Sequence, residues 1–170
     1  MLQLSAMLLN RPVMSLRTGT QIATTLAPII DPNNLKIEGF YCQDTQRKRL
    51  VLLEQDIRDV LPQGLVVNDA DALTEPGELI RLKNVMSLHF ELMGKQVVTS
   101  SRKKIGKVND YATETQSMMI KKLYVSQSLF KSFGTGSLGV DRTQIIEITR
   151  DQIVIQDLEE KVPAQAQALA

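Results

Sequence analysis

The chain carries one pattern of apolar residues twice, and this repeat limits its architecture more than any other feature of the sequence. Residues 141–157 match residues 53–69 at an offset of 88. The aligned apolar positions are Ile57 with Ile145, Val60 with Ile148, and 65–67 with 153–155. We therefore interpret the chain as a tandem duplication.

Two further blocks repeat in the same order. Residues 94–99 match 10–15 at an offset of 84, and residues 118–125 match 35–42 at an offset of 83. The offsets drift only by the lengths of the intervening loops. Chance similarity does not usually keep such order, so we expect two similar structural units.

Each unit reads as a run of short strands. The sequence Asp31-Pro32-Asn33-Asn34 is a dense turn signal, and residues 35–42 begin with the alternation of a half-buried strand. Short strands separated by turns at close spacing are typical of small antiparallel barrels or sandwiches. We predict an all-β chain, in which the segments 57–60 and 145–148 could each hold a single helical turn before the last strand of the unit.

Between the units, an acidic and turn-rich stretch leads to Pro76 and then to apolar residues at helical spacing. The predicted organisation is a first unit over 1–72, a linker with a short helix over 73–86, a second unit over 87–158 and a disordered tail over 159–170.

Composition excludes several classes of protein. The chain has 20 basic and 19 acidic residues, so no strong overall field draws it to nucleic acid or to an anionic membrane. A single cysteine, Cys42, excludes an intrachain disulfide and a multi-cysteine zinc site. Residues 1–9 are apolar but lack a basic lead, and no apolar run reaches the roughly 20 residues of a membrane span. We expect a cytoplasmic protein without a membrane span.

The repeated blocks resemble a known family. Residues 92–98 followed by 104–110 look like the opening of a PRC-barrel domain, and 141–148 with 153–155 look like its closing part. The family includes the photosynthetic reaction centre H subunit and the C-terminal part of the ribosome maturation factor RimM. The resemblance implies two tandem PRC-type barrels, and a family whose members act by contacting proteins without a shared set of catalytic residues.

Patterns that suggest chemistry have simpler interpretations. Gly134 to Gly139 satisfies GxGxxG, but a dinucleotide site needs a strand before these glycines and a helix after them, so we favour a hairpin. We interpret His89 as partly packed, Cys42 as a small buried residue, and the acidic pair Asp56 and Asp59 as solvated. We therefore predict no catalytic residue, cofactor or metal.

The two copies differ most at a basic turn and at an insertion over 126–136, which we interpret as a longer hairpin tip or flap. Residues 84–158 carry ten basic and seven acidic residues, so the second unit is mildly positive. The candidate interaction surface consists of Arg102, Lys103, Lys104, Lys107, Leu129, Phe130 and Phe133.

These observations favour a non-enzymatic protein-binding module. The alternative is a ribosome- or RNA-associated maturation factor that uses the basic turns of the second unit to contact phosphates. An enzyme ranks third, and self-association into a homo-oligomer stays open.

Overall fold

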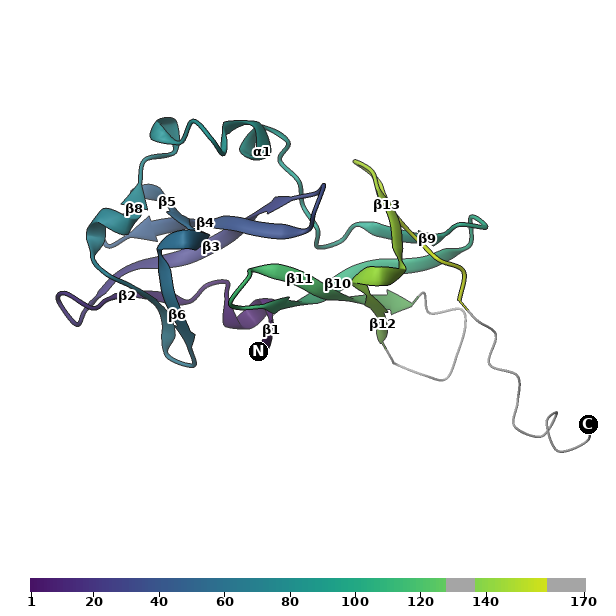
Figure 1. The fold of residues 1–170 in the computed structure, drawn as a ribbon, viewed down its shortest axis with the longest axis horizontal. Helices are drawn as coiled ribbons and strands as arrows, with labels where there is room; N and C mark the ends of the chain where they lie inside the picture. The colour runs from purple at the N-terminus through teal and green to yellow at the C-terminus, as the bar shows by residue number, and fades with distance from the viewer. Residues whose placement is uncertain (128–136, 159–170) are drawn as a thin grey trace, which may run out of the picture.

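The computed structural model describes residues 1–127 and 137–158, and most of them lie in β-strands (Figure 1). The described strands form one sheet of 14 strands that is not closed. The strands before the helix are β1 (Leu2–Leu4), β2 (Pro12–Ser15), β3 (Gln21–Asp31), β4 (Lys36–Asp44), β5 (Arg49–Leu53), β6 (Ile57–Leu61), β7 (Gly64–Val67) and β8 (Leu73–Thr74). Those after it are β9 (Gln96–Thr99), β10 (Lys104–Glu114), β11 (Met119–Gln127), β12 (Ser137–Asp141), β13 (Ile145–Ile148) and β14 (Gln152–Ile155). The prediction of a chain built mainly of strands is confirmed.

Helical structure in the described residues is short. The α-helix α1 covers Lys83–Ser87 and lies against β3. Single 3-10 turns occupy Ser5–Met7, Glu54–Asp56, Ala70–Ala72, Pro76–Glu78 and Arg142–Gln144. None of the described helices is long and apolar enough to cross a membrane.

The strands form two sets, β2–β7 and β9–β14, with the same pairing. β7 pairs in parallel with β2, and β14 pairs in parallel with β9, whereas the other neighbours within each set are antiparallel. Val13 lies opposite Leu65, and Val97 lies opposite Ile153. These are the residues that the sequence repeat aligns, so the repeat extends to the hydrogen-bond register.

Backbone conformation repeats as well. Equivalent residues with positive φ are Asn10 (56°) with Gly94 (81°), Gly19 (67°) with Arg102 (68°), and Leu35 (52°) with Met118 (55°). Side chains larger than Asn rarely adopt this region, because the Cβ atom crowds the backbone. That Leu35 and Met118 both do so indicates that the same turn closes the β3–β4 and β10–β11 hairpins.

The two sets meet through these hairpins. The amide of Ile37 donates to the carbonyl of Met118 at 2.8 Å, and the equivalent amide of Ile120 donates to the carbonyl of Leu35 at 2.9 Å. All four side chains are buried. Because each set donates one bond and accepts the equivalent one, the junction has the reciprocal geometry of a two-fold dimer interface within a single chain.

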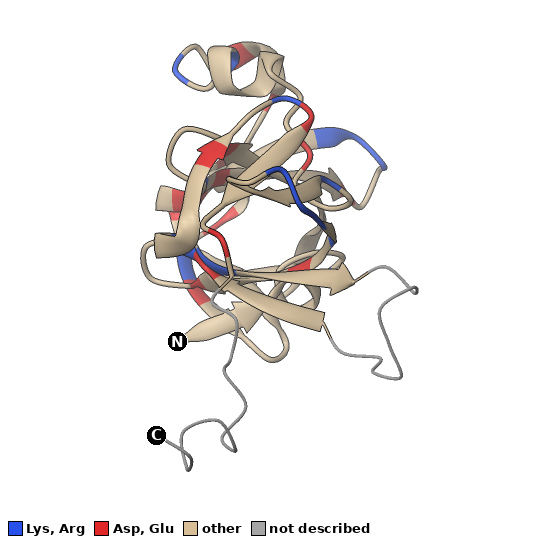
Figure 2. Ribbon diagram, turned by 90° about the vertical axis from the view of Figure 1, so that its right-hand side faces the viewer, with Lys and Arg blue, Asp and Glu red and all other residues tan. Residues whose placement is uncertain are grey.

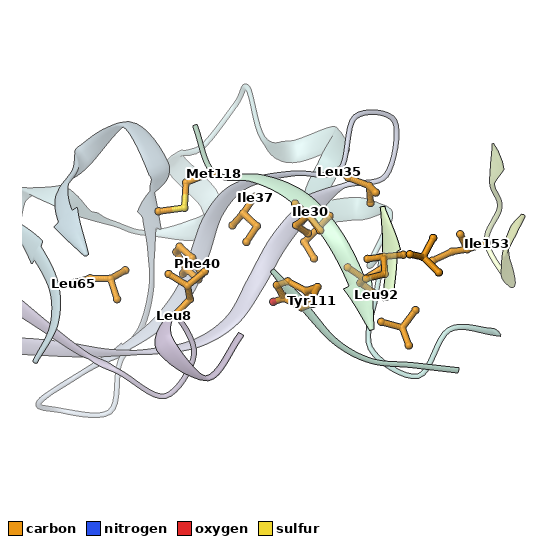
Figure 3. Close-up of a cluster of buried hydrophobic side chains, with 14 of the residues drawn as sticks. Leu8, Ile30, Leu35, Ile37, Phe40, Leu65, Leu92, Tyr111, Met118 and Ile153 are labelled. Carbon is orange, nitrogen blue, oxygen red and sulfur yellow. The ribbon is translucent and has the colours of Figure 1, made fainter. Parts of the chain in front are cut away.

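Most of the buried apolar side chains form one cluster across both sets (Figure 3). The cluster extends from Leu65 in β7 to Ile153 in β14, and Ile37 lies between them. Most of its members are aliphatic, and the large aromatic side chains among the fully buried residues are Phe40 and Tyr111. The core is therefore continuous through the junction.

The first residues of the chain pair with the second strand set. β1 pairs antiparallel with residues 112–114 of β10, and the hydroxyl of Ser5 donates to the carboxylate of Asp110 at 2.7 Å. The N-terminal ammonium lies 3.0 Å from the carboxylate of Glu114. This ammonium is the main cause that lowers the pKa of Glu114 to about 2, because it bonds the ionised carboxylate.

The predicted helical turns at 57–60 and 145–148 are wrong. The structure has 3-10 turns three residues earlier, and the predicted positions are strands β6 and β13. Each of these strands contains a register shift near its start, between Ile57 and Asp59 in β6 and between Ile145 and Glu147 in β13. The extra residue places side chains three positions apart on the same face of the strand, where an unbroken strand would place them two apart. The predicted tail 159–170, and the predicted flap from residue 128 onward, lie outside the described residues.

Candidate functional site

Two adjoining hollows lie along β13. The first, of about 370 Å³, is bounded by the β3–β4 turn (32–35) and by β13. The second, of about 620 Å³, is bounded by residues 87–91, from the last residue of α1 onward, and by residues 148–151 from the end of β13. They share Pro32 and Ile148, so we treat them as one feature, the β13 groove, whose walls come from both strand sets.

The outer edge of β13 faces no other described strand. β13 stands at the end of the sheet order and pairs with β14 alone among the strands of residues 1–127 and 137–158. A strand edge of this kind presents backbone N–H and C=O groups that can pair with another chain. The edge is also apolar, since Ile146 is 56% exposed and Ile145 and Ile148 are half-buried.

The equivalent edge of the first set, β6, is different. It carries the exposed, charged Arg58 where β13 carries Ile146. In addition, the carboxylate of Asp59 accepts from the amide of Val60 at 2.8 Å. Charged side chains on an edge strand discourage pairing with another chain. Both edges carry an exposed carboxylate at equivalent positions, Asp59 and Glu147, so the difference between them lies in the change from Arg58 to Ile146, which makes the β13 edge the less protected one.

Two basic side chains tie the walls of the groove together. The Arg142 guanidinium donates to the carbonyl of Ile120 at 3.2 Å and also to the carbonyl of Asn34 in the opposite wall. The Lys95 ammonium donates to the carbonyl of Arg150 at 2.5 Å and lies 4.8 Å from the centre of the Phe90 ring. Both cations thus donate to backbone carbonyl groups, and Lys95 also lies over an aromatic ring.

The acidic side chains of the groove form no ion pair with another described residue. Glu91, Glu147 and Asp151 are exposed, and none forms an ion pair within residues 1–127 and 137–158. The groove also has a cation without an ion pair among the described residues, the exposed Arg150, but Arg150 lines only the second hollow. In the first hollow Arg142 donates to carbonyl groups, so Glu147, beside the apolar edge, is the charged group there that can still accept a hydrogen bond. The groove is therefore suited to an apolar group accompanied by a basic one.

His89 is exposed, so the interpretation of a partly packed histidine is wrong. It follows α1, has a φ of 47°, and lines the second hollow. Its apolar neighbour Leu88 is also 55% exposed, which explains why the flanking residues misled the sequence argument. Cys42, by contrast, is fully buried as expected, and burial raises the pKa of its thiol to about 12.

The predicted interaction surface is placed only in part. Arg102, Lys103, Lys104 and Lys107 are exposed, whereas Leu129, Phe130 and Phe133 lie outside the described residues. Lys104 and Lys107 line a separate hollow of about 360 Å³ at the start of β10. Figure 2 shows basic and acidic positions interspersed over the ribbon, so the basic turn is a local feature.

The turn that carries these basic residues is held by Asp157. Its carboxylate accepts from the Ser101 hydroxyl at 2.8 Å, from the Ser101 amide at 3.1 Å and from the Ser100 hydroxyl at 3.2 Å. The bonds from Ser101 lower the pKa of Asp157. Lys103 and Lys104 therefore project from a well-defined turn.

The glycine motif does not have the surroundings of a dinucleotide site. Gly134 and Gly136 lie outside the described residues, and Gly139 lies inside β12. The segment that follows is a three-residue 3-10 turn and then β13, not a helix whose N-terminus could face a pyrophosphate.

Sequence reasoning missed the β13 groove. Its residues belong to the repeated block, which we interpreted only as the closing element of each unit. A usable signal was present at one position, where the charged Arg58 of the first copy becomes Ile146 in the second. No protein-family model matches the chain, and no curated protein matches it either.

Proposed function

We propose that this chain is a non-enzymatic protein-binding module of the PRC-barrel type, in which each strand set corresponds to one barrel, and that it binds a partner protein in the β13 groove. In this proposal the protein acts in the cytoplasm. The two sets, joined by residues 73–86, offer one composite surface because the groove takes its walls from both.

The observation that carries the proposal is the contrast between the two sheet edges. β13 combines an edge unpaired by any described strand, on which Ile146 is exposed, with adjacent hollows, whereas the equivalent β6 edge carries Arg58 in place of Ile146. Exposed apolar surface next to a hollow is typical of protein-interaction sites. Since the two copies share their apolar skeleton, a difference of this kind is not required by the fold.

Site-dependent capture tests the proposal. Wild-type protein and the variant Ile146→Lys are immobilised and exposed to native lysate, and bound proteins are quantified by mass spectrometry. Leu16→Lys is the matched control, because Leu16 is 62% exposed and lies in the turn after β2, away from the groove. We expect at least one protein to be captured by wild type and Leu16→Lys and lost with Ile146→Lys. Equal capture by all three proteins would refute the role of the groove.

A second candidate function is association with RNA or the ribosome. Its support is the hollow at the start of β10, where Lys104 and Lys107 are the charged lining residues in the described part of the chain. Co-sedimentation with ribosomal particles at low salt, lost on reversing the charges of Lys103 and Lys104, would favour it. Lys121→Glu on β11 is the control, and absence of association at every salt concentration would eliminate this candidate.

A further inference from the structure

We infer that the partner binds as an extended peptide that adds a strand to the outer edge of β13, with apolar side chains in the two hollows and a lysine or arginine beside Glu147. This inference rests on the proposed function, because it specifies how the β13 groove is occupied.

The backbone of β13 is suited to such pairing. Its inner edge is paired with β14, through Ile145 opposite Ile155 and Glu147 opposite Val154. Within the part of the chain that the structure describes, no side chain bonds the amides of Ile146 to Ile148, whereas the amide of Ile145 donates to the carbonyl of Arg142. In β6 the amide equivalent to that of Ile148, which belongs to Val60, is bound by Asp59. The amide of Ile148 is thus free, among the described residues, of the side-chain bond that its equivalent in β6 makes, which leaves β13 the more open edge for an incoming strand.

The groove beside β13 provides space for alternate side chains. A paired strand lies about 4.8 Å from its neighbour and directs successive side chains to opposite faces. Side chains on one face would enter the hollow over the β3–β4 turn at Pro32 and the hollow beside Phe90. The four residues of β13 correspond to a strand of roughly 13 Å at about 3.3 Å per residue. A peptide of about six residues would thus cover the strand and reach both hollows.

Charge selects the kind of peptide. In the first hollow the cation Arg142 already donates to carbonyl groups, whereas the exposed carboxylate of Glu147 has no ion-pair partner among the described residues. The exposed Arg150 lines only the second hollow, so it does not oppose a basic residue beside Glu147. Opposite charges on directly facing residues stabilise strand pairs, and like charges destabilise them. We therefore expect apolar residues to alternate with at least one basic residue, and acidic residues to be excluded near Glu147.

The test uses a phage-displayed library of ten-residue peptides with Val, Ile, Leu or Tyr at alternate positions and random residues between them. Full-length protein selects peptides, and synthetic copies are measured by fluorescence anisotropy. We expect lysine or arginine to be enriched at one random position, and Glu147→Lys to weaken binding of those peptides by about tenfold or more. Asp59→Lys, at the equivalent position of β6, should leave the affinity unchanged.

N-methylation of the peptide backbone separates strand addition from other binding modes and leaves the protein unaltered. Methylation at amides that bond to β13 should weaken binding by about tenfold, because each loses one hydrogen bond, whereas methylation at alternate amides should have little effect. A uniform response along the peptide would overturn strand addition while leaving the groove as a binding site. Failure to select any peptide, while protein capture still depends on Ile146, would overturn the peptide inference and keep the proposed function. If no peptide is selected and protein capture does not depend on Ile146, the peptide inference and the proposed function are both refuted.

Discussion

Ile37 and Ile120 are equivalent residues on the two sides of the junction between the strand sets, and truncating either one should destabilise both sets equally. Both side chains are fully buried in the common cluster. Ile→Ala removes three carbon atoms, worth about 2.4 kcal/mol at roughly 0.8 kcal/mol per buried methylene, and the remaining cavity raises the loss to about 3–4 kcal/mol. Because the cluster is continuous, this loss should appear in the unfolding of the whole described structure.

The assay combines urea unfolding followed by far-UV circular dichroism with hydrogen exchange read by mass spectrometry. We expect one transition that shifts to lower urea in Ile37→Ala, with faster exchange in peptides from β9 to β14 as well as from β2 to β7. Ile120→Ala should give the reciprocal result. Ile80→Ala is the control, since Ile80 is 85% exposed and its truncation should change stability by less than about 0.5 kcal/mol. If Ile37→Ala accelerates exchange only in the first set, the continuous core is refuted.

Three further predictions concern single groups. Gly106→Ala should lower the free energy of unfolding in urea by more than about 3 kcal/mol, because the added Cβ would lie 1.7 Å from the Ser126 carbonyl oxygen. The control Gly77→Ala should be close to neutral, because nothing lies within 4 Å of its added Cβ. Equal effects of the two substitutions would contradict the close approach of β10 to β11. The pKa of Glu114 is lowered from 4.5 to about 2 in the folded protein, so its ion pair with the N-terminal ammonium should stabilise the fold above about pH 4.5 and lose this effect as pH falls towards 2. Acetylating the N-terminus should therefore lower Tm at pH 6 and not at pH 2. Since burial raises the pKa of the Cys42 thiol to about 12, Ellman's reagent should label it at pH 8 only at the rate of protein opening, and immediate labelling of folded protein would contradict the burial.

The repeat of apolar positions was enough to predict the strand-rich fold, because alternation along a strand and the Asp31–Asn34 turn are local signals. It was not enough to locate the helical turns. The spacing of three between Ile57 and Val60 fits both a helical turn and a bulged strand, and the register shift between Ile57 and Asp59 shows that the bulged strand is correct. Sequence spacing cannot separate these two when the strand is short.

Other features depend on contacts between distant residues. The pairing of Leu2–Leu4 with Ala112–Glu114 and the bond from Arg142 to the carbonyl of Asn34 join segments about 110 positions apart. In such cases the apolar pattern within one segment does not indicate which distant segment it pairs with. The β13 groove is formed by the same long-range contacts, so the sequence could indicate the unusual Ile146 and not the hollows beside it.

The most direct test of the central claim is amide hydrogen exchange of the full-length protein, measured with and without a saturating bound partner or selected peptide. We predict new protection at Ile145–Ile148 and in the segment 87–91, with no change at the equivalent edge Ile57–Leu61. Protection that is confined to the basic turn at 102–107, or that appears equally at both edges, would contradict the assignment of the binding site to the β13 groove.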